Sequence, residues 1–279
     1  MWIDILCEQL AFPEGPAFAP DGSLWLVELE GGMLSQWNRN GLTRRACGGQ
    51  PNGMAIDHNG RAWVCDAGRS ELRRYSLPEA TGATIAATID HMPLLMPNDL
   101  AFDARGNLLF TCPGADIEHP AGYVCCLQPN GTITRIAEGM YFPNGLAFSD
   151  NGQTLVIAET YRQRLWKGSW DAIACCWIAA HPWAEVGGTT DGPDGMAYGA
   201  NGLLYVAIYS LGCIKAVAPD GSTVATHLLP GQNPTNCAFD PAGTLGLVVT
   251  EAERGMLLSL PELGPGLPLF DGGHAWPGD

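Results

Sequence analysis

The sequence is poor in basic residues. Only 14 of its 279 residues are Lys or Arg, against 29 Asp and Glu, and the formal net charge is −15. Nucleic-acid binding needs a basic surface, so this balance argues against a nucleic-acid partner. An acidic surface by itself indicates solubility. It is compatible with cation binding but does not demonstrate a metal site.

Long apolar runs are also missing. No stretch of 18 apolar residues is present, so we expect no membrane-spanning helix. The first residues, Met1-Trp2-Ile3-Asp4, lack the basic region and apolar core of a secretion signal. We therefore expect a cytoplasmic protein that acts on a small molecule, has no membrane partner, and is a monomer or a weak oligomer.

Metal-binding cysteine spacing is absent as well. The chain has ten cysteines but no Cys-x-x-Cys pair, the spacing typical of zinc sites. Two vicinal pairs, Cys125-Cys126 and Cys175-Cys176, fall in expected strands, where neighbouring side chains point to opposite faces. Thiols stay reduced in the cytosol, so we expect buried free cysteines.

The sequence also lacks helical periodicity, and it contains a repeated segment instead. No stretch of 12 residues keeps a helical pattern, whereas 36 Gly and 21 Pro suit many tight turns. A short segment with a polar residue, usually followed by Gly, and then an apolar run recurs six times. Its polar residues lie 38, 46, 46, 50 and 42 residues apart, a spacing typical of repeat proteins; they are Glu14, Asn52, Asn98, Asn144, Asp194 and Asn236.

Each repeat predicts a β-hairpin. A Gly follows the polar residue by eight positions in five repeats and by seven in the sixth, and several of these glycines follow Asp or Asn. A second apolar run comes after the turn, and often a third. Three or four strands every ~45 residues make one propeller blade. We therefore predict an all-β, six-bladed β-propeller that spans residues 1–279 as a single domain.

The two ends of the chain carry their own predictions. The apolar segment Trp2-Ile3-Asp4-Ile5-Leu6 has no partner in the first repeat, while the last repeat runs out of strands after Leu260. A ring of sheets exposes edges unless its ends are joined, so this N-terminal strand should complete the last blade. The Gly- and Pro-rich residues after Pro261 are expected to form a surface tail.

The polar residues of the repeat are candidates for a metal site. The first strand of each blade lines the axis of a propeller, so the six side chains should converge there. Two carboxylates and four amides form an oxygen-only set of charge −2, which suits Ca²⁺ first and also Mg²⁺ or Mn²⁺. The set lacks His, which argues against a His-built zinc site, although Zn²⁺ can use three oxygens and water.

A purely structural interpretation is also open, because Asn and Asp before Gly form turns in their own right. Against it, Glu14 and Asp194 interrupt an Asn-rich series, and a buried carboxylate pair is costly without a cation. A second set of residues, at the end of each second strand, is expected to brace the blades. It consists of Glu28, Asp66, Cys112, Glu159, Tyr209 and Glu251.

Four of these segments together resemble a known family. They are Phe12-Pro13-Glu14-Gly15-Pro16, Pro97-Asn98-Asp99-Leu100-Ala101-Phe102-Asp103, Phe142-Pro143-Asn144-Gly145-Leu146-Ala147 and Gly192-Pro193-Asp194-Gly195-Met196-Ala197. From about Phe12 to Leu260 the chain is similar to the gluconolactonase, senescence marker protein and luciferin-regenerating enzyme family. The resemblance implies a six-bladed propeller with a catalytic divalent cation in its channel.

Residue roles follow from the resemblance by position. Glu14, Asn144 and Asp194 match the three metal-binding side chains, and Asn98 matches an asparagine that lies beside the metal and contacts substrate or a fourth coordination site. Asn52 is left as a channel-lining residue that touches substrate. Asn236 is left in the same way.

The chain also departs from the family pattern. Animal gluconolactonases have an arginine two residues before the asparagine matched by Asn98, and here that position is Met96. The segment from Pro113 to Pro120 resembles the lid over the family's pocket and offers Glu118 or His119 to a substrate. Aldonolactone specificity therefore stays open.

The expected reaction is hydrolysis of a lactone ring by a metal-dependent enzyme, with Asp194 as general base. No Gly-x-Ser-x-Gly or Gly-x-Gly-x-x-Gly motif indicates covalent or dinucleotide chemistry. One fold hosts several reactions. Phosphotriester or aryl ester hydrolysis, lyase or isomerase chemistry, and a non-catalytic binding propeller therefore remain as alternatives.

Overall fold

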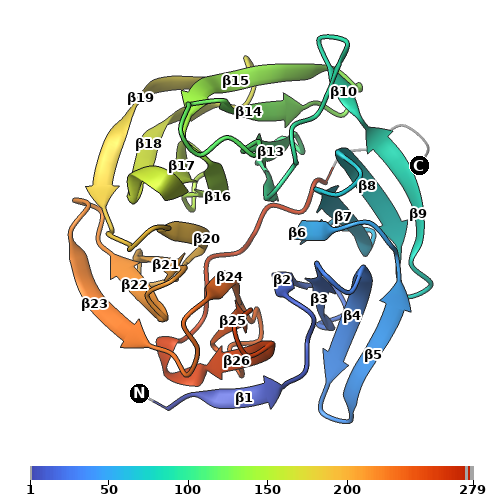
Figure 1. Ribbon diagram of the computed structural model, residues 1–279, viewed down its shortest axis with the longest axis vertical. Helices are drawn as coiled ribbons and strands as arrows, with labels where there is room; N and C mark the ends of the chain where they lie inside the picture. Colours follow the sequence, from blue (N-terminus) through green and yellow to red (C-terminus); the bar gives the residue numbers. More distant parts are fainter. Residues whose placement is uncertain (1, 274–275, 277–279) are drawn as a thin grey trace.

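The computed structural model describes residues 2–273 and 276 and shows six four-stranded antiparallel sheets arranged in a ring (Figure 1). The six-bladed β-propeller and its nearly all-β content confirm the fold prediction. Each blade begins with a strand at the axis and ends with a strand at the rim of the ring.

The strands of the first three blades follow chain order. Blade 1 has β2 (Pro13–Phe18), β3 (Leu24–Glu28), β4 (Met33–Asn38) and β5 (Gly41–Ala46). Blade 2 has β6 (Pro51–Ile56), β7 (Arg61–Asp66), β8 (Glu71–Ser76) and β9 (Thr81–Ala86). Blade 3 has β12 (Leu100–Phe102), β13 (Leu108–Cys112), β14 (Gly122–Leu127) and β15 (Ile133–Met140).

The other three blades complete the ring. Blade 4 has β16 (Pro143–Phe148), β17 (Thr154–Glu159), β18 (Arg164–Asp171) and β19 (Cys176–Glu185). Blade 5 has β20 (Pro193–Tyr198), β21 (Leu204–Ile208), β22 (Cys213–Val217) and β23 (Thr223–Leu228). Blade 6 has β24 (Pro234–Phe239), β25 (Leu247–Glu251), β26 (Met256–Leu260) and the N-terminal β1 (Asp4–Cys7).

The N-terminal strand closes the ring, as predicted. β1 pairs antiparallel with β26, and Asp4 lies opposite Ser259. The sheet order β1-β26-β25-β24 therefore joins the first residues of the chain to the last repeat. This pairing covers the edge that β26 would otherwise expose.

The hairpin turns lie where the glycines predict them. Gly60 and Gly202 have φ angles of 75° and 78°, in the left-handed region that glycine adopts without strain. In blade 2 the turn is closed by a hydrogen bond from the Gly60 amide to the Asp57 carbonyl over 2.8 Å. All the turns between first and second strands share one face of the ring, and the first residues of the inner strands lie at the other.

The core consists of apolar layers between neighbouring blades. Alternation along one strand supplies two layers at once: Cys125 packs in a cluster with Trp63 and Phe110, while its neighbour Cys126 packs with Val124 in another. All ten cysteines are free, as predicted. The second vicinal pair differs from expectation, because Cys175 precedes β19 with a φ of 51° and Cys176 is exposed.

Few elements lie outside the blades. A small hairpin of β10 (Thr88–Ile89) and β11 (Met92–Pro93) projects at the rim between blades 2 and 3 (Figure 1). The helical segments among the described residues are two 3₁₀ turns, η1 (Thr160–Arg162) and η2 (Pro261–Leu263). No helix in this described part is long and apolar enough to cross a membrane.

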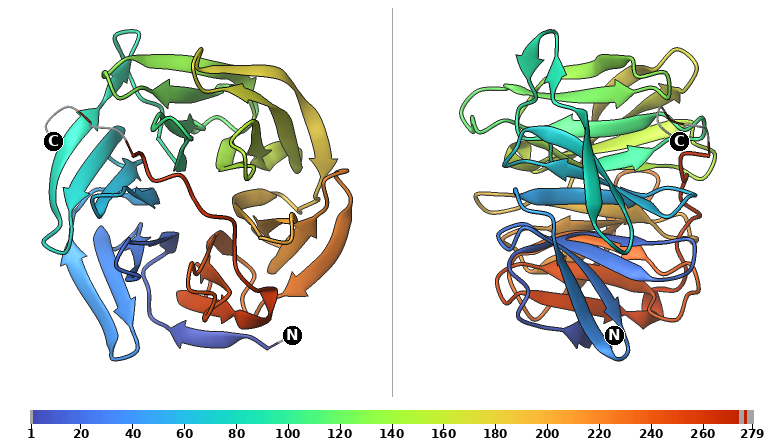
Figure 2. Two further views of the ribbon diagram at one scale, coloured as in Figure 1. Left: turned by 180° about the vertical axis from the view of Figure 1, so that it is seen from behind. Right: turned by 90° about the vertical axis from the view of Figure 1, so that its right-hand side faces the viewer.

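The C-terminal residues form a strap, defined here as residues 264–273. Figure 2 shows the strap crossing the axis on the face that carries the hairpin turns. The Leu267 amide donates to the Tyr198 carbonyl of blade 5, and the Asp271 carbonyl accepts from the His58 amide of blade 2, both over 2.9 Å.

Trp276, beyond the strap, is a buried anchor. Trp276 is 3% exposed and packs on Trp63 with ring centroids 4.7 Å apart, close to Phe102 of blade 3. The prediction of a simple surface tail is therefore wrong for this segment. An indole in a Gly- and Pro-rich stretch buries enough apolar surface to fix the chain across the ring.

Candidate active site

The six polar residues of the repeat lie at the same end of the inner strands and are all buried, with exposed fractions of 4–8%. Their orientation has a local cause, because the pairing of the inner strand with the second strand is interrupted at or beside the polar residue. Such interruptions occur between Glu14 and Ala17 and between Pro193 and Met196. Irregularities of this kind re-aim side chains near active sites.

The glycine that follows the polar residue has a packing role. A Cβ atom on Gly15 would lie 2.6 Å from the Met54 amide nitrogen of the next blade. The inner strands of blades 1 and 2 therefore approach so closely at this point that only glycine fits. This close approach brings the polar side chains of successive blades together, and it explains why Gly recurs in the motif.

Glu14 and Asp194 form the electrostatic centre of the ring. Burial, together with the nearby Asp99 charge, raises the pKa of Glu14 to about 8. Burial, followed by the charges of Glu14 and Asp99, raises the pKa of Asp194 well above its usual range. No cationic side chain is among the groups that act on either carboxyl in the described structure. The pair is therefore mutually repelling and uncompensated.

Two of the ring amides contact these carboxylates. The Asn144 side chain lies beside Asp194 and the Asn236 side chain lies beside Glu14, and each amide lowers the pKa of the neighbouring carboxyl. Asn52 and Asn98 are 8% exposed each and occupy the matching positions of blades 2 and 3. The Asn98 carbonyl accepts from the Gly53 amide over 2.6 Å, which ties these two positions together.

Asp99 is a channel carboxylate that the repeat pattern did not single out. It is 7% exposed, and burial raises its pKa to about 6. Its carboxylate accepts a hydrogen bond from the Leu100 amide over 2.9 Å, and the nearby Asn236 side chain lowers its pKa. The signal was present in the sequence, because Asp99 occupies the position where four other repeats have Gly.

The residues at the ends of the second strands brace the channel entrance, as predicted. Glu28, 2% exposed, accepts from the Ala11 amide, the Ser35 hydroxyl and Arg44. Glu159 accepts from the Tyr141 amide over 2.8 Å. Each carboxylate thus holds the segment that leads into the inner strand of its own blade. Asp66 and Glu251 do the same through the amides of Gln50 and Asn233.

Blade 3 differs, since Cys112 occupies the bracing position. There the Tyr123 hydroxyl accepts from the Leu95 amide over 3.1 Å and holds the segment before Met96. Met96 itself is 37% exposed at the entrance, with a φ of 51°.

The lid residues Glu118 and His119 lie in an exposed loop between β13 and β14. His119 is 74% exposed, and its Nδ1 lies 3.0 Å from the Asp116 carboxylate. The same carboxylate accepts from the backbone amides of both residues over 2.9 Å. Asp116 thus orders this turn, and the role of the two residues as substrate contacts stays a prediction.

The donor set fits a hard cation better than a zinc cluster. Within residues 2–273 and 276, no group of three or more His, Cys, Asp or Glu side chains is arranged to hold a metal. The ring instead combines carboxylate and amide oxygens, which is the ligand type that Ca²⁺ and Mg²⁺ prefer. Two buried carboxylates without a cationic partner make a divalent ion a physically suitable occupant.

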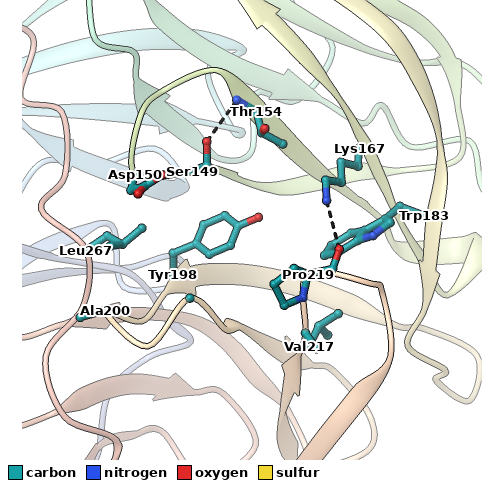
Figure 3. Close-up of a pocket in the computed structure, with 12 residues that line it drawn as sticks. Ser149, Asp150, Thr154, Lys167, Trp183, Tyr198, Ala200, Val217, Pro219 and Leu267 are labelled. Carbon is teal, nitrogen blue, oxygen red and sulfur yellow. Dashed lines mark hydrogen bonds between the residues drawn. The ribbon is translucent and has the colours of Figure 1, made fainter.

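A separate cavity of about 240 Å³ lies between blades 4 and 5 on the strap face (Figure 3). Tyr198 points into it, and Leu267 of the strap forms one wall. The Lys167 amine at its edge donates to the Pro219 carbonyl over 3.3 Å. Because these residues lie near the hairpin turns, the cavity is not part of the polar ring.

The fold and the buried ring define a class of protein, the six-bladed β-propellers with polar, oxygen-bearing side chains at one end of the axis. Within that class the chain belongs to the SMP-30/gluconolactonase/LRE-like family, whose model matches residues 12–253. The family resemblance is thereby confirmed.

Individual relatives support this assignment. The chain is 25% identical over 274 residues to a gluconolactonase of Zymomonas mobilis, covering 86% of this chain and 76% of that protein. It is 31% identical over 174 residues to a diisopropyl-fluorophosphatase of Loligo vulgaris, and this match spans 56% of the chain and about half, 54%, of the relative. A solved gluconolactonase of Xanthomonas campestris superposes with a TM-score of 0.81 at 25% identity, over 95% of this chain and 89% of that one.

Proposed function

We propose that this protein hydrolyses a lactone to the corresponding hydroxy acid in a reaction that requires a divalent cation. The observation that carries the proposal is the buried, uncompensated pair of Glu14 and Asp194 at one end of the axis. The names of its relatives support lactones as the substrate class, since they include gluconolactonases and other lactonases.

Glu14, Asn144 and Asp194 would hold the cation, with Asn98 beside them as a fourth ligand or substrate contact. Calcium is the first choice for this oxygen set, and zinc, manganese or magnesium are the alternatives. When bound, such a cation supplies Lewis-acid polarisation of a carbonyl and lowers the pKa of water.

Asp194 acts as the general base. A carboxyl with a raised pKa is suited to take a proton near neutral pH, and burial with nearby negative charge raises the pKa of Asp194. It accepts one proton from the attacking water, whose oxygen forms the new bond to the carbonyl carbon. The ring C–O bond then breaks, and the leaving oxygen takes up a proton to become the hydroxyl of the product.

The remaining residues position the reactants. Asn98 orients the lactone, Asn52 lines the channel on the neighbouring blade, and Glu118 and His119 of the lid face the substrate from above. Asn236 lies beside Glu14 and Asp99 and lowers the pKa of both carboxyls. The cytoplasm is the proposed location, and the ten free thiols agree with a reducing compartment.

The proposal is tested by acid release from a panel of lactones with protein that has been stripped of metal and reloaded. We expect thermal stabilisation by Ca²⁺ or a related ion, reversal by EDTA, and acid release only in the reloaded protein. Full activity after metal removal would rule out the proposed chemistry. Stabilisation without acid release from any lactone would move the reaction to another electrophile.

A second candidate is hydrolysis at phosphorus, which the 31% identity to a diisopropyl-fluorophosphatase favours. The same ring would serve, with a phosphoryl oxygen in place of the lactone carbonyl oxygen. Fluoride release from diisopropyl fluorophosphate by the same reloaded protein distinguishes this candidate.

A further inference from the structure

The entrance of the channel is bordered by the residues immediately before each inner-strand proline. None of the six is charged, and three are large and apolar, namely Phe12, Met96 and Phe142; the others are Gln50, Gly192 and Asn233. Each lies directly before the buried proline that begins the strand or leads into it. They therefore form the first layer that a molecule meets on its way to the ring.

The three apolar residues are held in an unusual backbone conformation. Phe12, Met96 and Phe142 have φ angles of 58°, 51° and 60°, which is rare for bulky side chains and disfavoured before proline. Such conformations persist where surrounding contacts over-determine them, and they cluster at ligand sites.

Those contacts are present at the entrance. The carbonyls of Phe12 and Phe142 accept from the Leu29 and Thr160 amides over 2.9 and 3.1 Å. The residues just before them are braced by Glu28 and Glu159. Backbone hydrogen bonds and bracing carboxylates therefore fix the apolar border at Phe12 and Phe142.

Blade 3 contributes the most accessible part of this border. Leu95, Met96 and Ile117 are 44%, 37% and 58% exposed. The lid loop that carries Ile117 is tied to the same segment by a hydrogen bond from the Gly114 amide to the Leu95 carbonyl over 3.2 Å. Two of these exposed apolar residues therefore lie on the segment just before Asn98, the residue expected to orient the substrate, and the third lies on the loop tied to that segment.

Blade 4 supplies an aromatic side to the entrance. Phe142 and Tyr161 pack edge to face with ring centroids 5.0 Å apart. Burial, with the charges of Asp191 and Asp194, raises the pKa of Tyr161. An apolar group entering beside Phe142 would thus lie close to the general base.

We infer that the substrate is a lactone whose ring carries an apolar alkyl or aryl substituent, rather than a polyhydroxylated sugar lactone. This inference rests on the proposed function. The lactone carbonyl lies at the ring, and the substituent covers Leu95, Met96 and Phe142 at the entrance. Removing these surfaces from water favours binding in proportion to the apolar area covered.

The test compares kcat/KM for γ-lactones that bear unbranched chains from methyl to hexyl with that for D-glucono-1,5-lactone, all with calcium-loaded protein. We expect kcat/KM to rise about threefold per methylene over the first few carbons, and the sugar lactone to be the poorest substrate. Equal rates along the alkyl series, or a faster sugar lactone, would overturn the inference while leaving lactone hydrolysis intact.

Variants locate the subsite. Met96→Arg should lower kcat/KM for the hexyl lactone at least tenfold and leave the methyl lactone nearly unchanged, whereas Met96→Leu should keep the alkyl preference. Met92→Arg introduces the same charge at a 62% exposed position in the hairpin at the rim, and it should change neither value. A Met96→Arg protein with an unaltered alkyl preference would contradict the assignment.

Two further measurements distinguish a wrong inference from a variant that does not fold and from a wrong proposed function. Leu95→Glu repeats the test if Met96→Arg does not fold, because Leu95 is held in the structure through its backbone. If no lactone is hydrolysed while calcium still raises Tm, the proposed function itself fails, and the inference with it.

Discussion

The side-chain amide of Asn144 donates a hydrogen bond to the hydroxyl of Thr160 over 3.3 Å. The Thr160 hydroxyl donates in turn to the carbonyl of Pro193 over 2.7 Å, directly before Asp194. One buried hydroxyl therefore joins two of the expected metal ligands and orients the Asn144 amide with its oxygen available.

Removal of this hydroxyl should weaken cation binding. Partners that orient metal ligands are typically worth 10–100-fold in affinity, so we expect Thr160→Val to raise the Kd for Ca²⁺ about tenfold. Thr160→Ser keeps the hydroxyl and should bind like the unaltered protein. Isothermal titration calorimetry measures both, and equal affinities would contradict the link between Thr160 and the site.

Neutral replacements of the two ring carboxylates should abolish activity without unfolding the protein. Loss of a general base typically costs 10²–10⁴-fold, so Asp194→Asn should reduce kcat at least a hundredfold, and Glu14→Gln should remove calcium stabilisation as well. Circular dichroism and Tm in EDTA check the fold. Asp220→Asn, in the exposed turn between β22 and β23, is the matched control.

Asp99→Asn should have opposite effects on stability and on metal binding. At pH 8 Asp99 is ionised, because its pKa is raised by burial only to about 6, and its charge repels Glu14. Its neutral replacement should raise Tm in EDTA at pH 8 and weaken calcium binding. A fall in both quantities would mean that Asp99 acts through packing rather than charge.

Calcium stabilisation should grow with pH. The pKa of Glu14 rises from its usual 4.5 to about 8 in the folded chain, so between these values the folded state holds a proton that the unfolded state has lost. Stability of the metal-free protein therefore falls as pH rises through this window. Protons also compete with the cation, so the rise in Tm on adding calcium should be larger at pH 8 than at pH 5.5. An equal rise at both values would count against a cation bound to these carboxyls.

The strap should contribute stability without contributing to substrate binding. Trp276 is 3% exposed and packs on Trp63, and truncating a buried Trp typically costs about 3 kcal/mol or more. Trp276→Ala should therefore lower the midpoint of urea unfolding and leave KM unchanged. Leu269→Ala alters a strap residue that is 76% exposed and should change neither.

The repeat spacing was sufficient to predict the ring and its closure. Every blade begins with the same short motif, and the period of the polar residues matches one blade, so six sheets followed directly. The unpaired segment at the N-terminus had only one free edge to cover, beside β26. Local periodicity and the need to cover edges determined this part of the fold.

Two features were not predicted from the sequence, because they depend on packing between distant segments. Asp99 takes a position that other repeats fill with Gly, and its burial depends on how closely neighbouring blades approach. Trp276 lies more than 200 residues from Trp63, and no local pattern predicts that contact. In both cases the available signal was a residue type that is unusual for its position. Asp99 is a carboxylate where most repeats have Gly, and Trp276 is an indole in a Gly- and Pro-rich stretch.

The strap makes the two ends of the axis unequal. It runs from blade 5 to blade 2 across the face with the hairpin turns, while Glu14 and Asp194 lie at the other end of the inner strands. In the proposed reaction, the substrate enters and the product leaves at the end of the axis that carries these carboxylates. The hydroxy acid leaves by the route along which the next lactone arrives, so accumulated product competes with fresh substrate, and the enzyme works best where another reaction drains that product.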